Sequence, residues 1–360
     1  NGGQSKMAER QIWFITRPER DPRFHAEAMK ALDEATNHFT IKWQGNREIQ
    51  KELEKVLGEH GLKRNNISND GSGGRTWCAM LKTFAYCYLD KEGYLHPTKV
   101  GQALIDGNKE YENVKKQILT LQIPNAYFME SGFRPKYDEG FRIFPARFLI
   151  RLVQQEALDY YITKEEITYF ALTAKKDNQL SEIIDKIVEF RNATQDEKEV
   201  KKLEIAENYD HRERSDHAAR DYFNAHADVA HTFMMLCDYT GLVEYERGTG
   251  KLTQQPSLVQ ESTNVLSYYE KRYPFNTRYL ISTERMAQNN GLDVDSYKAS
   301  SMGGIAPAGN HGKLQNKIET ILSQYTSARI PTKEELYPEF EKAFGPRDAK
   351  KIIETIEFET

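Results

Sequence analysis

The sequence has few cysteines, no long apolar run and little excess charge of either sign. Its three cysteines, Cys78, Cys87 and Cys237, show no paired spacing, which indicates a reducing compartment without structural disulfides. No apolar run approaches the roughly 20 residues that a membrane span needs, and there is no secretory segment near the start. The net charge of −4 does not indicate a nucleic-acid binder, although a binding face needs only local positive charge. We therefore expect a cytoplasmic protein.

The chain does have enough apolar residues for packed cores, because 39% of its 360 residues are hydrophobic. This length suits two to three domains. We expect residues 1–6 to be a vector-derived remnant outside the fold. Helical periodicity dominates the rest. Residues 46–60, for example, place Ile49, Leu53, Val56 and Leu57 on one face, and Gly61 is expected to end that helix.

The order of the expected elements is typical of a winged helix-turn-helix. The helix at 46–60 is followed by a polar loop, a short helix running into a strand, a hairpin turn at 90–93 and a helix that opens at Pro97 and Thr98. A second such unit consists of a helix ending at Gly241, the strand "LVEYE", the turn "RGTG" and the strand "KLTQQP". The predicted fold is mainly α with small β wings (α+β), with tandem winged-helix subdomains and a helical linker region.

These units divide the sequence into three predicted parts. The first winged-helix subdomain spans 7–140, the second spans 141–256, and 257–360 form a mostly helical linker or third subdomain. In the second part, Thr163 with Glu166 has the form of a capping box. A helix is expected over 175–193, and a charge-dense connector follows it.

A polar stretch at residues 61–82 is the first candidate for DNA contact. Cations that neutralise phosphates lie here among amides that can read base edges. The alternative is a solvated loop rich in Gly, Ser and Asn. The candidate residues are Lys63, Arg64, Asn65, Asn66, Asn69, Arg75, Thr76 and Lys82.

A second candidate face combines a polar turn with a basic segment. Recognition helices present their first side chains where a polar turn enters the helix N-terminus, and Lys175, Lys176, Asn178 and Gln179 precede such a helix. The alternative is again a solvated connector. The companion basic segment supplies His211, Arg212, Arg214, Ser215 and Arg220.

Two other patterns do not indicate chemistry. His211, His217, His226 and His231 lack the i, i+4 spacing that a helical zinc pair prefers, so capping, surface or DNA-backbone roles are favoured over a metal site. The segment "GSGGRT" lacks the Gly-Lys-Ser/Thr ending of a phosphate-binding P-loop.

Four segments in matching order resemble the AlwI-type family of type IIS restriction and nicking endonucleases: "AMLKTFAYCYLDKEGYLHPTKVGQAL", "TYFALTAKKDNQLSEIIDKIVEFRN", "KKLEIAENYDHR" and "DYTGLVEY". The resemblance runs from about Ile12 to about Pro256 and weakens thereafter. It implies an N-terminal region of winged-helix subdomains that recognises a short asymmetric DNA site. It also implies a separate C-terminal PD-(D/E)xK nuclease domain that cuts at a fixed distance with Mg²⁺.

The nuclease pattern itself is not found in this sequence. Mg²⁺-dependent cleavage needs carboxylates that hold the ion and a lysine near the attacking water. No Pro-Asp dipeptide occurs, and the short matches at 199–201 and 348–350 fall in helical context. "LDVDSYK", with Asp293, Asp295 and Lys298, imitates the pattern but lies in a Gly/Ser-rich loop region. We therefore predict no catalytic or metal-binding residue and no cofactor in this chain, with Mg²⁺ required by the parent nuclease.

The leading hypothesis is a sequence-specific double-stranded DNA recognition domain that binds a short asymmetric site as a monomer. An asymmetric site needs no two-fold protein, whereas regulators that bind palindromes are usually dimeric. The alternatives are a winged-helix transcriptional regulator or adaptor, and a complete Mg²⁺-dependent endonuclease with an unrecognised active site.

Overall fold

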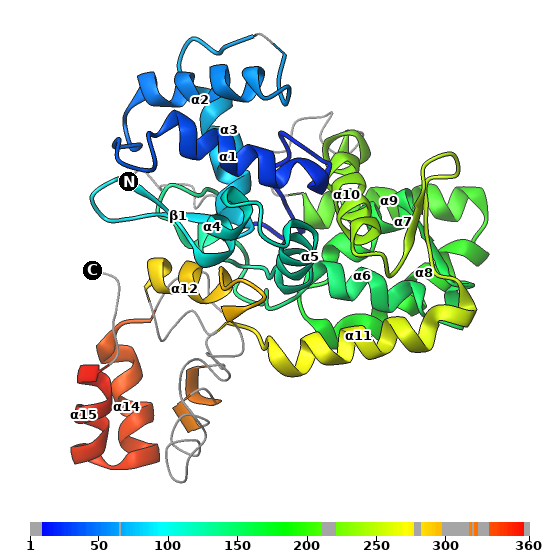
Figure 1. The fold of residues 1–360 in the computed structure, drawn as a ribbon. Coiled ribbons are helices and arrows are strands. Elements are labelled where there is room, and N and C mark those ends of the chain that lie inside the picture. The colour runs from blue at the N-terminus through cyan, green and yellow to red at the C-terminus, as the bar shows by residue number, and fades with distance from the viewer. Residues whose placement is uncertain are drawn as a thin grey trace, which may run out of the picture.

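The computed structural model describes residues 9–64, 66–210, 221–276, 282–296, 317–318, 320–322 and 331–355. These residues are mostly helical and include two small antiparallel sheets, which confirms the α+β class (Figure 1). No helix in these ranges is long and apolar enough to cross a membrane. All three cysteines are buried free thiols, as their spacing predicted.

Among its described residues, the first unit contains five α-helices and one hairpin. Its elements are α1 (His25–Ala35), α2 (Arg47–Glu59), α3 (Ser72–Thr83), β1 (Cys87–Leu89), β2 (Leu95–Pro97), α4 (Lys99–Ile105) and α5 (Glu110–Thr120). Helix α2 confirms the helix that the apolar periodicity of residues 46–60 predicted. The Asn46 side chain caps it by accepting the Ile49 N–H at 3.2 Å, and Gly61 follows its end with φ +75°.

Helix α3 begins within the stretch that was expected to be a loop. It starts at Ser72, so Gly73 and Gly74 are helical. A Cβ atom on Gly74 would lie 2.1 Å from the backbone oxygen of Gln50, and one on Gly73 would lie 2.0 Å from Glu54 Oε1. The glycine pair therefore allows the first turn of α3 to approach α2 more closely than any side chain would permit.

The hairpin β1–β2 forms as predicted, with Tyr88 opposite His96. Its turn is not a free tip, because the backbone oxygen of Gly93 accepts the N–H groups of Trp43 at 2.9 Å and Gln44 at 3.0 Å. The backbone N–H of Lys91 donates to Glu284 at 3.0 Å. The hairpin thus packs against the loop before α2 and against a later helix, and its assignment as a wing stays a prediction.

The second unit combines a three-stranded sheet with helices. Its elements are α6 (Pro145–Val153), β3 (Tyr161–Thr163), α7 (Lys164–Tyr169), α8 (Leu180–Asn192), α9 (Gln195–Tyr209), α10 (Tyr222–Tyr239), β4 (Glu244–Glu246) and β5 (Lys251–Thr253). The strand order is β3-β5-β4. The capping box of Thr163 and Glu166 is confirmed, with bonds of 2.9 and 3.1 Å. Helix α9 occupies the expected charge-dense connector and has a capping box at Thr194.

The N-terminal segment packs on the second unit rather than only on the first. Trp13 is buried between Phe148 and Phe233, and its Nε1 donates to the backbone oxygen of Ala174 at 2.6 Å. One apolar core runs from Ile12 to residues of the second unit and beyond. The predicted domain boundaries near 140 and 256 remain predictions.

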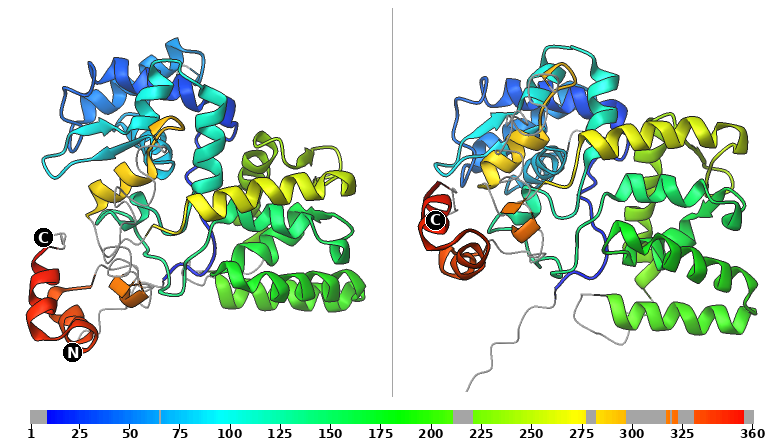
Figure 2. Two further views of the ribbon diagram at one scale, coloured as in Figure 1. Left: turned by 60° about the horizontal axis from the view of Figure 1, so that its bottom comes forward. Right: turned by 90° about the horizontal axis from the view of Figure 1, so that it is seen from below.

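Beyond β5 the described chain is helical, as expected for this part of the sequence. Its helices are α11 (Val259–Arg272), α12 (Thr283–Asn290), α14 (Lys333–Phe344) and α15 (Pro346–Thr355). Helix α11 packs on α6, where Gln154 Nε2 donates to Ser262 Oγ at 2.9 Å. Helices α14 and α15 build a separate small core together with Ile318, Ile321 and Leu322, and the two helices lie apart from the second unit (Figure 2).

Short 3₁₀ turns connect several of these elements. They are η1 (Pro22–Phe24), η2 (Tyr127–Met129), η3 (Glu156–Leu158), η4 (Ala171–Thr173), η5 (Asp177–Gln179) and η6 (Pro256–Leu258).

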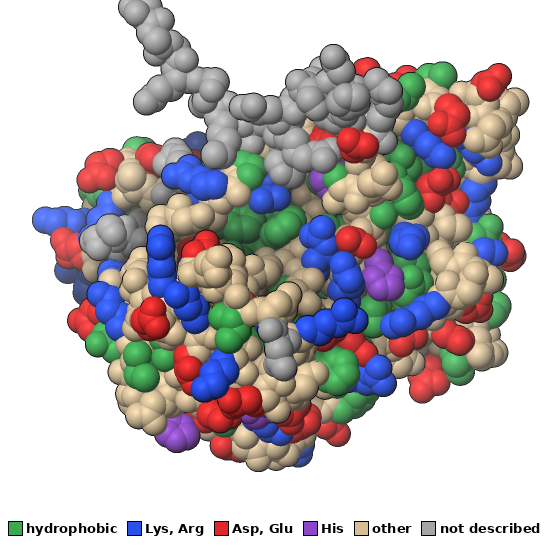
Figure 3. Space-filling model, turned by 90° about the horizontal axis from the view of Figure 1, so that it is seen from above, with side chains coloured by type: hydrophobic (Ala, Val, Ile, Leu, Met, Phe, Trp, Pro, Cys, Tyr) green, Lys and Arg blue, Asp and Glu red, His purple; other side chains and the backbone are tan. Residues whose placement is uncertain are grey.

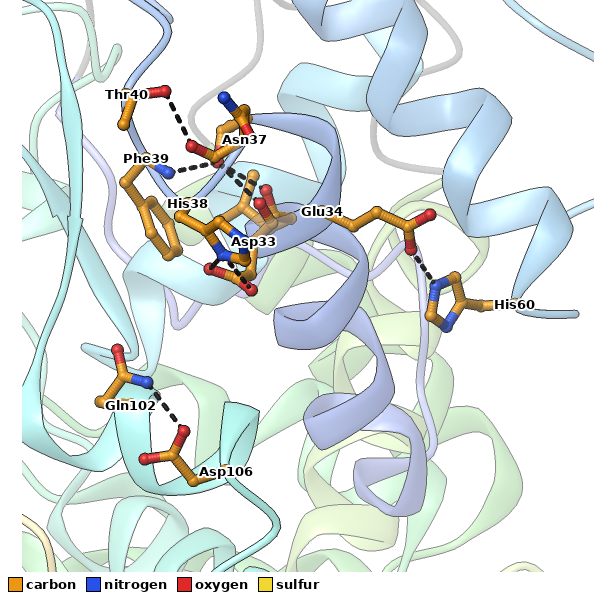
Figure 4. A network of polar contacts seen from close by, with 11 residues as sticks. Asp33, Glu34, Asn37, His38, Phe39, Thr40, His60, Gln102 and Asp106 are labelled. Carbon is orange, nitrogen blue, oxygen red and sulfur yellow. Dashed lines mark hydrogen bonds and ion pairs between the residues drawn. The ribbon is translucent and has the colours of Figure 1, made fainter.

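His60 follows α2 directly and contacts two carboxylates of α1, of which Figure 4 shows Glu34. Its Nε2 is 2.7 Å from Glu34 Oε2 and its Nδ1 is 3.0 Å from Glu27 Oε2. The hydrogen bonds to Glu34 and Glu27 raise the pKa of His60 above its ordinary value. Protonated His60 therefore holds two carboxylates of α1 against the C-terminus of α2.

Candidate nucleic-acid interface

The N-terminal half of α3 presents a short polar face to solvent. Ser72, Arg75 and Thr76 are exposed, whereas the following residues from Trp77 to Leu81 are buried. Residues at i, i+3 and i+4 share one side of a helix, so these three side chains form one face. The Thr76 hydroxyl donates to the backbone oxygen of Ser72 at 2.9 Å, within that face.

A buried carboxylate fixes the loop that leads into this helix. The side chain of Glu54 on α2 accepts the Lys63 ammonium at 3.0 Å, the Ser68 N–H at 3.1 Å and the Ser68 hydroxyl at 2.6 Å. Lys63 also donates to the backbone oxygen of Asn66. Burial alone raises the pKa of Glu54, but the Ser68 hydrogen bonds and the Lys63 charge outweigh it and hold the pKa below its usual value. The loop is therefore pinned by three charge-assisted contacts.

The guanidinium of Arg75 is held by Gln50 and Asp70. Its Nη1 donates to Gln50 Oε1 at 2.8 Å and to the backbone oxygen of Asp70 at 2.7 Å. Its Nη2 is 3.5 Å from Asp70 Oδ2, and no described residue accepts a hydrogen bond from its Nε. Nε is thus the guanidinium nitrogen without a partner among the described residues, and Nη2 has a single long contact, to Asp70.

The other predicted residues of this stretch differ in their surroundings. Arg64, Asn66 and Asn69 are exposed on the loop, while Asn65 lies outside the described residues. Lys82 points inward. It forms an ion pair with Glu130 at 2.9 Å, and its ammonium lies 4.7 Å from the ring centroid of Tyr127.

The Glu130 contact sets the protonation of Lys82. Burial by itself lowers the pKa of this lysine, but the Glu130 carboxylate raises it above its ordinary value. DNA contact by Lys82 would require this ion pair to open.

The residues of the second predicted DNA-contacting face also differ in their surroundings. Lys175 forms an ion pair with Asp138 at 3.0 Å and donates to Gln11 Oε1 at 2.7 Å. The Gln179 side chain accepts the Lys176 N–H at 2.9 Å before α8 begins. Lys176 and Asn178 are exposed. The companion residues lie outside the described part of the chain: His211, Arg212, Arg214, Ser215 and Arg220.

The structure brings together a third set of basic residues that sequence reasoning missed. We call it the α10 basic surface, consisting of Arg17, Arg20, Lys164, His231 and Arg247. Figure 3 shows the molecule from above, and on that face Lys and Arg side chains gather near the middle beside a histidine. Its members come from the N-terminal segment, α7, α10 and the β4–β5 turn, so no local pattern in the sequence could have grouped them.

The described residues do not form a magnesium site at the best imitation of the nuclease pattern. Asp293 Oδ1 accepts the Ser296 N–H at 2.8 Å, and Asp295 forms an ion pair with Lys109 at 2.7 Å. Lys298 lies outside the described residues. Within the described ranges, no three His, Cys, Asp or Glu side chains group as metal ligands. The matches at 199–201 and 348–350 lie in helices α9 and α15, as predicted.

A cavity of about 320 Å³ lies between α6, α11 and the start of α8. The arginines that line it bind other groups of the protein: Arg151 pairs with Glu270 at 2.7 Å, and Arg147 Nε donates to the backbone oxygen of Leu119 at 2.6 Å. These contacts join α6 to its neighbours, and no ligand is assigned to the cavity.

Comparison with known proteins places the chain. No curated protein sequence matches it. A solved structure of pyrene- and phenanthrene-modified DNA in complex with the BpuJ1 endonuclease binding domain is similar, with a TM-score of 0.49 and 16% identity over 81% of this chain and 100% of that chain. The AlwI restriction endonuclease family profile matches residues 86–332, so the match begins after the first candidate loop and extends past Pro256. This range is more than half of the 360 residues, and the chain therefore belongs to the AlwI restriction endonuclease family.

Proposed function

We propose that this chain is the sequence-specific double-stranded DNA recognition part of a type IIS restriction or nicking endonuclease, and that it binds a short asymmetric site as a monomer. Family membership supports a restriction endonuclease. Among the structural features, the N-terminal face of α3 is the strongest support for DNA recognition. On this face an arginine held in one position lies beside a loop that is fixed in place and exposes amide side chains.

Arginine 75 is the base reader in this proposal. A guanine presents O6 and N7 as two acceptors in the major groove, and a guanidinium edge with two N–H groups matches them. Gln50 and the backbone oxygen of Asp70 hold Nη1, so the guanidinium is oriented without further loss of side-chain freedom. In this proposal the guanine replaces the long 3.5 Å contact between Nη2 and the Asp70 carboxylate. A contact of this kind is worth about 1 to 3 kcal/mol of discrimination against other bases.

The loop supplies contacts of a different class. Arg64 is an exposed cation, and it neutralises phosphate rather than reading bases in this proposal. Asn66 and Asn69 are exposed amides on the same loop, suited to adenine edges or to the backbone. Glu54 keeps all three in place before DNA arrives, which lowers the entropic cost of binding.

We further propose that this polypeptide binds its site without cutting it. In this proposal other residues hold the Mg²⁺ of the parent nuclease, and the observation that supports it is that Asp293 accepts the Ser296 N–H while Asp295 pairs with Lys109. Incubation of a supercoiled plasmid bearing the selected site with protein and Mg²⁺ tests this. Nicked or linear product that disappears in an Asp293→Asn, Asp295→Asn variant would contradict it.

The recognition proposal is tested by selecting bound duplexes from a random pool and repeating the selection with Arg75→Ala. We expect the wild-type protein to enrich one short asymmetric sequence, and the variant to lose preference at one base pair of it. Arg347→Ala, which removes an exposed arginine of α15, is the matched control and should leave the selected sequence unchanged. An equal loss of affinity for all sequences in Arg75→Ala would make Arg75 a phosphate contact. Two-fold symmetric selected sites bound by a dimer would favour a regulator.

A further inference from the structure

Four cations from three separate parts of the chain converge beside α10. Arg17 and Arg20 precede η1, Lys164 is the first residue of α7, and Arg247 begins the β4–β5 turn. The Arg20 Nη2 atom lies 3.3 Å from Asp228 Oδ2 on α10, which ties the N-terminal segment to this helix. The convergence is a tertiary feature of the second unit.

Positive charge on this surface exceeds its local compensation. The side chains of Arg17 and Lys164 form no hydrogen bond or ion pair with a described residue. Arg247 donates to the sulfur of Met235 at 3.6 Å, and the carboxylate that its charge reaches, Asp21, is already paired with Arg23 at 2.6 Å. Asp228 is already engaged by Arg20. Three cations are therefore left available to an anion.

The excess positive charge destabilises the charged form of Arg17 in the free protein. Arg17 is half-buried, and burial lowers the pKa of its guanidinium from the ordinary value, with Arg20 lowering it further and Asp228 opposing the change. A partly desolvated cation whose nearest carboxylate, Asp228, is already paired with Arg20 is unfavourable, and a further anion placed against it lowers that cost. The surface is suited to a polyanion.

The shape of this region suits a long, extended ligand. Gly248 in the β4–β5 turn is exposed, and a Cβ built on it meets no atom within 4 Å, so the turn projects into open space. Helix α10 exposes Asn224 and Asp228 and half-exposes His231 along one stripe. A projecting turn beside an exposed helix stripe is the arrangement in which a helix approaches a groove while its neighbours contact the backbone.

We propose that Arg17, Lys164 and Arg247 bind the phosphate backbone of the DNA duplex, with a phosphate lying beside His231. This inference rests on the proposed function and extends it to the second unit. The groups that face His231 are Lys164, Arg20, Arg247 and Asp228, together with the Tyr245 hydroxyl at 2.7 Å from its Nδ1.

The surroundings of His231 link DNA binding to pH. Burial, followed by the charges of Lys164, Arg20 and Arg247, lowers the pKa of His231 below its ordinary value in the free protein, while Asp228 opposes the change. A phosphate beside the ring stabilises the imidazolium and raises this pKa, so binding takes up a proton. DNA affinity then increases as the pH falls from 8 to 6.

The first test compares two triple variants by fluorescence anisotropy between about 50 and 200 mM salt, the range in which counter-ion release is readily measured. Arg17→Gln with Lys164→Gln and Arg247→Gln should reduce the slope of log K against log salt by about 2 to 3, because each phosphate contact contributes about 0.9. The selected sequence should stay unchanged. The control removes three exposed cations of α14 and α15: Lys342→Gln, Arg347→Gln and Lys350→Gln.

The second test keeps the inference falsifiable if loss of Arg17 impairs folding. Lys164→Gln with Arg247→Gln should lower the slope by about 2 in a folded protein. His231→Gln should lose the pH dependence between pH 6 and 8. A slope equal to that of the control, or an unaltered pH dependence in His231→Gln, overturns the inference. Failure of the wild-type protein to prefer any duplex overturns the proposed function instead.

Discussion

Replacing Glu54 by Gln should release the loop that presents Arg64, Asn66 and Asn69. The carboxylate accepts three hydrogen bonds, at 3.0 Å from Lys63, and at 3.1 and 2.6 Å from the N–H and hydroxyl of Ser68. Hydrogen bonds to a charged group contribute roughly 1.5 to 3 kcal/mol each, against roughly 0.5 to 1.5 for neutral pairs. Neutralising the acceptor therefore costs about 2 to 3 kcal/mol, since three neighbouring contacts do not add fully.

The loss should be local because the contacts join a single side chain of α2 to one loop. Hydrogen exchange of amides in 62–72 should accelerate by about 30- to 150-fold, which is the same free energy expressed as an opening constant. Affinity for the selected duplex should fall as the loop opens. Glu52→Gln is the matched control, because Glu52 is exposed on the same helix and no described residue pairs with it.

Acid should have the same effect as the substitution. The pKa of Glu54 is depressed in the folded protein, so its contribution is present above the unfolded pKa of about 4.3 and is lost as the pH falls through the folded value. Unchanged exchange in 62–72 in Glu54→Gln would refute the idea that this carboxylate pins the loop. Faster exchange with unchanged DNA affinity would show that the loop is pinned but does not contact DNA.

Three further changes test the packing and the ionisable groups. Gly74→Ala should lower the free energy of unfolding, measured with a chemical denaturant, by about 1 to 3 kcal/mol, because the added Cβ pushes α3 away from α2. Gly248→Ala, whose Cβ has open space around it, should change this free energy by no more than about 0.5 kcal/mol. Equal effects would contradict the close approach of the two helices. The pKa of His60 is raised in the folded protein, so its contribution to the free energy of unfolding is complete below its unfolded pKa and is lost as the pH rises through the folded pKa. The thermal midpoint of the wild type should therefore exceed that of His60→Asn by more at pH 6 than at pH 9. Burial lowers the pKa of Lys116 to about 7. Lys116→Met should therefore stabilise the protein at pH 7.5 by roughly 2 to 3 kcal/mol, after allowing for the lost hydrogen bond to Gln117, and the gain should shrink towards pH 10. A destabilised variant would show that the charged form of Lys116 is paired.

Local patterns predicted the elements that local chemistry determines. The periodicity of 46–60, the Asp90–Gly93 turn and the capping box at Thr163 each use contacts within a few residues, and the structure confirms all three. The start of α3 was missed because Gly73 and Gly74 are typical of a loop in sequence, whereas their role is to let α2 and α3 approach.

The candidate interface was harder to predict because its contacts are long-range. The sequence predicted Arg75 as a DNA contact, and that stays a prediction; the partners that hold its side chain include Gln50, 25 residues away. The same stretch included Lys82, whose inward ion pair with Glu130 spans 48 residues. The α10 basic surface joins Arg20 to Asp228 across 208 residues, a contact that no local pattern contains.

The most direct test of the central claim is the ratio of two affinities. The duplex selected from a random pool and a scrambled duplex of equal length and composition are titrated with this polypeptide at the same physiological salt concentration. A recognition domain should bind the selected duplex at least about 10³-fold more tightly than the scrambled one. Affinities that agree within a few-fold at every salt concentration would contradict sequence-specific recognition by this chain.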